Sequence, residues 1–207
     1  INGVELFSNA FNGYRLIARN TATGWQDTFA YVASFALAEK NKRFLLHTTG
    51  KGDTMTFGFN PNTAQSGIYF VDLEGWSLKP LFRAKGKFPQ IALNEYGNQA
   101  AFLADTDTTK ARIRPYQLCH WEIKQDSAKV IANPQSDFLK NPNNQLDNST
   151  NNQLNKSTNN QITKSTDTQW LISEHARPIF SDDGSKLYFG IAPPPVLNDT
   201  TLLPEEI

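Results

Sequence analysis

The histidines are the side chains of this 207-residue chain that could carry out acid–base chemistry or bind a transition metal. His47, His120 and His175 lie far apart, and no Asp or Glu stands at a metal-ligand spacing beside a second histidine. The G-x-S-x-G motif, which holds a nucleophilic serine on a strained strand-to-helix turn, is absent, and Gly75-Trp76-Ser77 lacks its closing glycine. We therefore expect no catalytic residue, no metal site and no cofactor in this chain.

A charged group before Pro178 is the most distinctive candidate for a binding role. Glu174, His175 and Arg177 stand between two predicted strands, and loops of this kind carry binding residues more often than core segments do. A contact with a substrate or with a neighbouring domain is one interpretation. Hydrogen bonds that stabilise a turn are the alternative.

Four aspartates could supply the oxygen ligands that hard cations take. They are Asp105, Asp107, Asp182 and Asp183, and no EF-hand spacing accompanies them. Asp side chains also accept hydrogen bonds from nearby turn amides. We interpret these residues as turn formers.

The elements that position these residues begin with a strand–turn–strand segment, Pro178–Phe189. Asp182 and Asp183 can accept hydrogen bonds from turn amides, and Gly184 can adopt the positive φ of a tight turn. An apolar strand resumes at Leu187. The pattern predicts an antiparallel hairpin.

Two other segments follow the same pattern, Phe35–Leu46 and Ile91–Phe102. Asn41 and Gly97 take the place of Gly184, and both residue types tolerate the left-handed conformation. The spacing from Gly97 to Gly184 is longer than the spacing from Asn41 to Gly97, and the difference is roughly the length of an insert that interrupts the repeat. The sequence therefore predicts a repeat.

That insert consists of three tandem octapeptides of the form NNQLxxST, at 143–150, 151–158 and 159–166. With one Leu or Ile each and no aromatic residue, they bury too little surface to offset the entropy of ordering. We expect a disordered loop at 142–167. It separates repeat units in 1–141 from their continuation in 168–207.

A second hairpin follows each of the first two turns. One joins Gly67–Gly75 to Leu78–Phe82, and the other joins Tyr116–Lys124 to Ala128–Ala132. Each repeat thus carries four strands, which is one blade of a β-propeller. We expect an all-β partial propeller of about three four-stranded antiparallel blades. Because closed propellers have four to eight blades, we expect the chain to be part of a longer protein.

Charge and hydropathy narrow the classes of partner. Twenty basic and twenty acidic residues balance, and the basic residues are scattered singly, so we expect no nucleic-acid binding. No apolar run reaches the roughly 18 residues that a membrane helix needs, so we expect no membrane span.

The segment Ser173–Pro193, with Asp199–Leu203 after it, resembles the TolB-like propeller repeats at the front of bacterial serine peptidases of the prolyl oligopeptidase family. The resemblance covers nearly the whole chain outside the octapeptides. It implies that a C-terminal α/β-hydrolase domain, absent here, carries a Ser-Asp-His triad, and that the propeller restricts access to short peptide substrates. Periplasm and cytoplasm both remain open as compartments.

Two functions follow from this sequence. In the first, the chain is the non-catalytic propeller portion of such a peptidase, and it gates peptide access and supports the hydrolase domain. In the second, it is a non-enzymatic propeller that binds a protein or cell-wall partner, since binding propellers share the Asp-Gly turn. The parent protein of the first hypothesis is a hydrolase, and the chain by itself is inactive.

Overall fold

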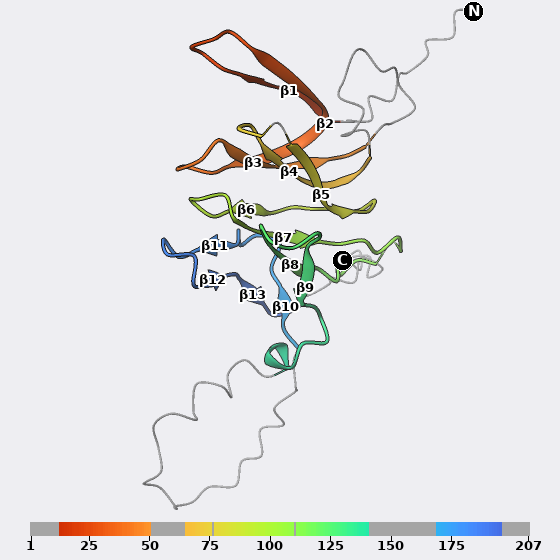
Figure 1. Ribbon diagram of the computed structural model, residues 1–207. Helices are drawn as coiled ribbons and strands as arrows, with labels where there is room; N and C mark the ends of the chain where they lie inside the picture. The colour runs from red at the N-terminus through yellow and green to blue at the C-terminus, as the bar shows by residue number, and fades with distance from the viewer. Residues whose placement is uncertain (1–12, 51–64, 76, 110, 141–168, 196–207) are drawn as a thin grey trace, which may run out of the picture.

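The computed structural model describes residues 13–50, 65–75, 77–109, 111–140 and 169–195 (Figure 1). Within these ranges the regular structure is antiparallel β, apart from the 3-10 helix η2 (Asp137–Leu139). The all-β expectation is confirmed. The octapeptide tract at 142–167 lies outside the described residues. In the described ranges, no helix has the length and apolar character needed to cross a membrane.

The first sheet has five strands in sequence order: β1 (Tyr14–Arg19), β2 (Gln26–Leu37), β3 (Arg43–Thr48), β4 (Gly67–Asp72) and β5 (Ser77–Arg83). We expected four strands per repeat, and the fifth arises because β2 is long enough to pair twice. Its first half pairs with β1 and its second half with β3. The strand changes partner near Tyr31, which has a φ of 58°, and near a bulge between Val32 and Ser34.

The second sheet has four strands in the expected order: β6 (Ile91–Leu93), β7 (Gln99–Ala104), β8 (Gln117–Glu122) and β9 (Lys129–Ala132). Each strand pairs with the next through a hairpin or loop. The two hairpins predicted for this repeat are both present.

The third layer holds two short antiparallel pairs. β10 (Leu171–Ile172) pairs with β13 (Ile191–Ala192), and β11 (Ile179–Phe180) pairs with β12 (Leu187–Tyr188). The β11–β12 hairpin is the one predicted at the Asp-Asp-Gly turn. Among the described residues of this layer, the two pairs do not join into the four-stranded sheet that we expected.

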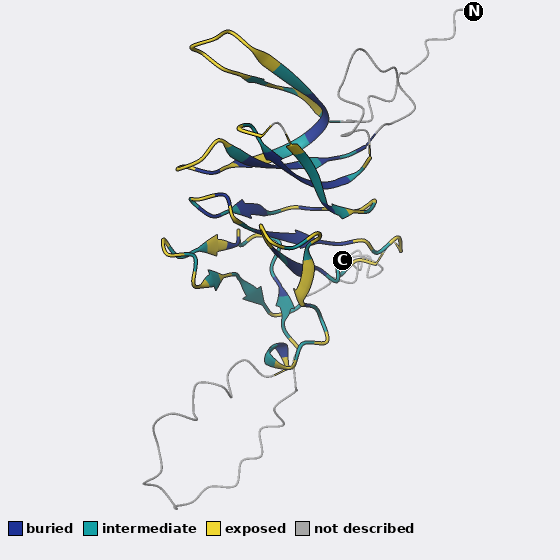
Figure 2. Cartoon of the chain, viewed as in Figure 1, coloured by how far each residue is buried: buried dark blue, intermediate teal, exposed yellow. Residues whose placement is uncertain are grey.

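The three layers stack face to face, and many strand residues between them are buried (Figures 1 and 2). Apolar side chains fill the space between the layers. One cluster joins the first sheet to the second and includes Phe70 packed on Trp121, with ring centroids 4.7 Å apart. Another joins the second sheet to the third layer around Leu103 and Leu118. A third lies under the β1–β2 hairpin. Every internal sheet face is therefore covered by its neighbour.

The turns of the three hairpins lie one above another at one end of the stack (Figure 1). Gly97 has a φ of 63°, and a Cβ placed on it would lie 2.8 Å from Cβ of Arg43 and 3.0 Å from Cβ of Ala38. Gly184 has a φ of 69°, and its Cβ would lie 2.8 Å from Oε1 of Gln99. Each glycine thus satisfies both a left-handed backbone and a close approach to the preceding turn.

Asn41 behaves differently from the two glycines. Among the described non-glycine residues, positive φ occurs at Tyr31 and not at Asn41, so the left-handed conformation expected there is not adopted. Asn41 instead donates from Nδ2 to the carbonyl of Tyr96, at 2.6 Å. Its role in the turn is a hydrogen bond to the next repeat.

Polar contacts fix the first turn against the second. The amide of Lys40 donates to the carbonyl of Glu95, at 2.9 Å, and the Lys40 ammonium pairs with the Glu95 carboxylate. The same ammonium lies 4.7 Å from the ring centroid of Tyr96. These bonds hold the two sheets in one relative position.

Replacing Gly97 by alanine tests the importance of this close approach. We expect Gly97→Ala to lower the free energy of unfolding by about 2–3 kcal/mol, because the new Cβ combines an unfavourable φ with an overpacked contact. Urea denaturation measures the change. Gly75→Ala is the matched control, since nothing lies within 4 Å of its added Cβ, and we expect less than about 0.5 kcal/mol. Equal effects of the two substitutions would contradict the close approach.

Candidate functional site

The loop from Asp105 to Tyr116, between β7 and β8, is built around a buried ion pair at the end of the stack away from the turns. Asp105 is buried, and its carboxylate accepts hydrogen bonds from Nε of Arg114 and from the amide of Asp107. Arg114 also donates to the carbonyls of Thr109, at 2.9 Å, and Asp107, at 2.8 Å. Asp105 is thus paired as buried charges generally are. The hydrogen bond to Asp105 raises the pKa of Arg114.

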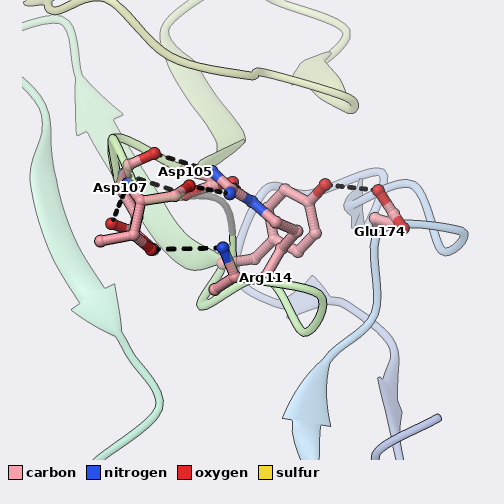
Figure 3. A network of polar contacts seen from close by, with 7 residues as sticks. Asp105, Asp107, Arg114 and Glu174 are labelled. Atoms are coloured by element: carbon pink, nitrogen blue, oxygen red, sulfur yellow. Dashed lines mark hydrogen bonds and ion pairs between the residues drawn. The ribbon is translucent and has the colours of Figure 1, made fainter. Parts of the chain in front are cut away.

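Tyr116 connects this loop to Glu174, which is labelled in Figure 3 and lies in the segment before β11. Its hydroxyl donates to the carboxylate of Glu174, and Nε2 of Gln90 donates to the Glu174 carbonyl, at 2.9 Å. Burial of the Tyr116 ring and the nearby Glu174 carboxylate both raise the pKa of the hydroxyl. Glu174 is therefore held by two side chains of the preceding repeat.

A cavity of about 220 Å³ opens between the Asp105–Tyr116 loop and the segment around Glu174. Its wall combines apolar residues, including Ile113 and Pro193, with charged ones. The charged and titratable lining residues are Arg112, Arg114, Tyr116, Glu174 and His175. A small concave wall of this composition is suited to binding a ligand with both apolar and charged parts.

The three predicted contact residues do not share one cavity. Glu174 and His175 line the cavity just described, and the side chain of His175 is 90% exposed. Arg177 lines a different cavity of about 360 Å³, beside Leu93 and Ile179. The candidate site therefore contains Glu174 and His175, with Arg177 on the neighbouring surface.

No pattern in the sequence indicates that Tyr116 and Gln90 belong to this site. Tyr116 reads as the start of an apolar strand, and Gln90 as a polar residue before one. They reach Glu174 only because the third layer stacks on the second sheet. The residue type of Asp105 marked it in the sequence as a possible cation ligand or turn former, whereas nothing in the sequence marked its partner Arg114.

The other titratable candidates have structural surroundings. Burial lowers the pKa of His47 to about 4, and its ring packs against Phe88 with centroids 5.0 Å apart. Burial also lowers the pKa of His120, and it raises the pKa of the Cys119 thiol to about 12. The His47 and His120 rings are therefore kept neutral, and the Cys119 thiol is a poor nucleophile.

The Asp-Asp-Gly turn places its acidic groups differently from a cation site. The Asp183 carboxylate accepts hydrogen bonds from the hydroxyl of Ser181, at 2.6 Å, and from the amide of Ser185, at 2.9 Å. The Ser181 hydrogen bond is the main reason that the Asp183 pKa falls to about 2. Across the described ranges, no three residues of the His, Cys, Asp and Glu types gather in a metal-binding group.

Comparison with known proteins adds no relative: no family model, curated protein or solved structure matches this chain. The fold and the cavity define an all-β protein of stacked antiparallel sheets with a small cavity of mixed apolar and charged lining at one end.

The bond between Tyr116 and Glu174 can be measured by a double-mutant cycle. We expect Tyr116→Phe and Glu174→Gln to show a coupling free energy of about 1 kcal/mol, because the half-exposed carboxylate retains some contact with water. Chemical denaturation of the two single variants and the double variant gives the value. Tyr188→Phe is the control for loss of an exposed hydroxyl. Additive effects at Tyr116 and Glu174 would show that the bond does not hold the loop.

The buried His47 makes stability depend on pH. Its pKa is about 4 in the folded state and roughly 6.5 in the unfolded chain. The stabilising effect is complete above pH 6.5 and is lost as the pH falls toward 4, because only the unfolded chain takes up the proton; the loss is at most about 3 kcal/mol. We expect His47→Gln to flatten the decline in unfolding midpoint between pH 6.5 and 4. His175→Gln, at an exposed position, should leave it unchanged, and the same slope in both variants would refute the assignment.

Proposed function

We propose that this chain forms part of a β-propeller that serves as the non-catalytic access domain of a serine peptidase of the prolyl oligopeptidase type. The observation that carries the proposal is the repetition of one hairpin with its turn in three successive layers. In a propeller, four-stranded antiparallel sheets pack face to face around a central channel. The second sheet has that strand number and order.

The arrangement of the first strands supports the propeller. β2 and β6 contact each other, and β6 also contacts β11, so the leading strands of the three hairpins lie side by side. β6 stands at the edge of its sheet. Strands in this position line the channel of a propeller, and the two further hairpins of the first two repeats provide its outer strands.

The peptidase assignment rests on the resemblance of Ser173–Pro193 to propeller repeats of that family. The position of Glu174 and His175 is compatible with it, because the cavity beside them lies at an end of the stack, where loops of a propeller meet a substrate or a partner domain. The groups that line this cavity, among them Arg112, Arg114 and Glu174, are suited to binding a charged peptide. The proposed role is therefore to admit short peptides and to support a hydrolase domain that performs the cleavage.

Sequencing and expression of the polypeptide beyond Ile207 test the proposal. We expect a downstream G-x-S-x-G motif and labelling of its serine by a fluorophosphonate probe. The full-length protein should cleave short peptides and leave folded proteins intact. Substitution of the motif serine by alanine is the control and should abolish both signals.

A downstream region that lacks G-x-S-x-G would remove the peptidase assignment. If that region supplies further sheets and no enzyme domain, the chain belongs to a binding propeller for a protein or cell-wall partner. The repeated hairpins favour both propeller classes equally, and the motif separates them.

A further inference from the structure

One face of the third layer is open where the equivalent faces of the first two layers are closed. The comparison uses cross-strand pairs at matching positions around the three turns. These pairs are Ala36 with Leu45, Ala92 with Ala101, and Ile179 with Tyr188. Directly opposite residues in an antiparallel pair project from the same face, so each pair marks one face of its hairpin.

Burial separates the third pair from the other two. Ala36 and Leu45 are 5% and 0% exposed, and both belong to the cluster that packs on the second sheet. Ala92 and Ala101 are 3% and 0% exposed, and Ala101 packs toward the third layer. Ile179 and Tyr188 are 61% and 56% exposed. Large apolar side chains thus stand uncovered at positions that the following layer buries elsewhere.

The turn shows the same asymmetry. Gly97 is seated against Ala38 and Arg43 of the first turn, and Gly184 against Asn94 and Gln99 of the second. Ser181 and Lys186 hold the corresponding positions in the third turn. Ala38 and Asn94 are buried, whereas Ser181 is partly exposed and Lys186 is exposed. Ser181 and Lys186 are therefore exposed at the positions that contact a turn glycine in the two earlier turns.

We infer that the face marked by Ile179, Tyr188, Ser181 and Lys186 is the docking surface for a further hairpin layer of the same repeat, supplied by the same polypeptide. The occupant carries a glycine that seats between Ser181 and Lys186 and apolar residues that cover Ile179 and Tyr188. The inference rests on the propeller architecture of the proposed function. It adds the surface on which the next layer packs and the residue type its turn must carry.

A second copy of the chain fits this surface less well. Both existing contacts join successive repeats within one chain. The outer face of the first sheet of a second copy is partly occupied by its own β1–β2 hairpin, through Leu16, Ala18 and Phe29, and it exposes Phe35 and Leu37 beside that hairpin. The continuity of the two existing contacts therefore favours a layer from the same polypeptide.

Thiol labelling of the full-length polypeptide tests the inference. Ile179→Cys and Tyr188→Cys are introduced separately, with Ile131→Cys in β9 as a control at a 50% exposed position. Cys119 is retained because it is buried, and peptide mapping by mass spectrometry separates its signal. We expect iodoacetamide to modify positions 179 and 188 at least about tenfold more slowly than position 131.

Equal rates at all three positions would overturn the inference. Protection that disappears on dilution would also overturn it, because it would identify a second copy as the occupant. Protected positions in a protein without G-x-S-x-G would keep the docking surface and remove the peptidase assignment. Reactive positions 179 and 188 in a protein that carries G-x-S-x-G would keep the peptidase assignment and remove the docking surface.

Discussion

The close contact between successive turns is the constraint on which the rest of the stack depends. Packed sheets are usually separated by about 10 Å of side chains, but the backbone at Gly97 lies directly against side chains of the first turn. Small residues continue this approach into the strands, where Ala36, Ala92 and Ala100 are buried near the turns. With the turns fixed by glycine and by the Lys40–Glu95 contacts, neighbouring sheets have little freedom to slide or rotate.

Larger side chains fill the stack farther from the turns. Phe82, Phe88 and Phe102 meet edge to face, with centroids 5.7 to 6.3 Å apart, and His47 joins them through Phe88. Because this cluster excludes water, a charge on His47 is costly, and the same packing that joins two sheets also keeps the imidazole neutral. In the outer strands, Trp121 packs on Phe70 and donates to the carbonyl of Gln125, at 2.8 Å. The buried indole is thereby satisfied.

The strand pairing of this fold was largely predictable, whereas the contacts between layers were not. Alternating apolar residues around Gly97 and Gly184 identify hairpins, because turn chemistry is local and recorded in consecutive residues. Asn41 shows the limit of that argument: its residue type allowed a left-handed turn, yet it bonds to Tyr96 of another repeat. The Tyr116–Glu174 bond and the separation of Arg177 from Glu174 also depend on how layers stack. No local pattern encodes that arrangement.

The amino-acid sequence can therefore vary to different extents at the two ends of the stack. At the turn end, added atoms at Gly97 collide with the preceding repeat, so the sequence there is restricted by packing. At the other end, Asp105 and Arg114 organise a loop by internal bonds, and Tyr116 and Gln90 reach across to the next layer. The loop surface around the 220 Å³ cavity can change without disturbing the sheets. A scaffold fixed at one end and variable at the other suits recognition, because ligand specificity can alter while the stack that carries it stays the same.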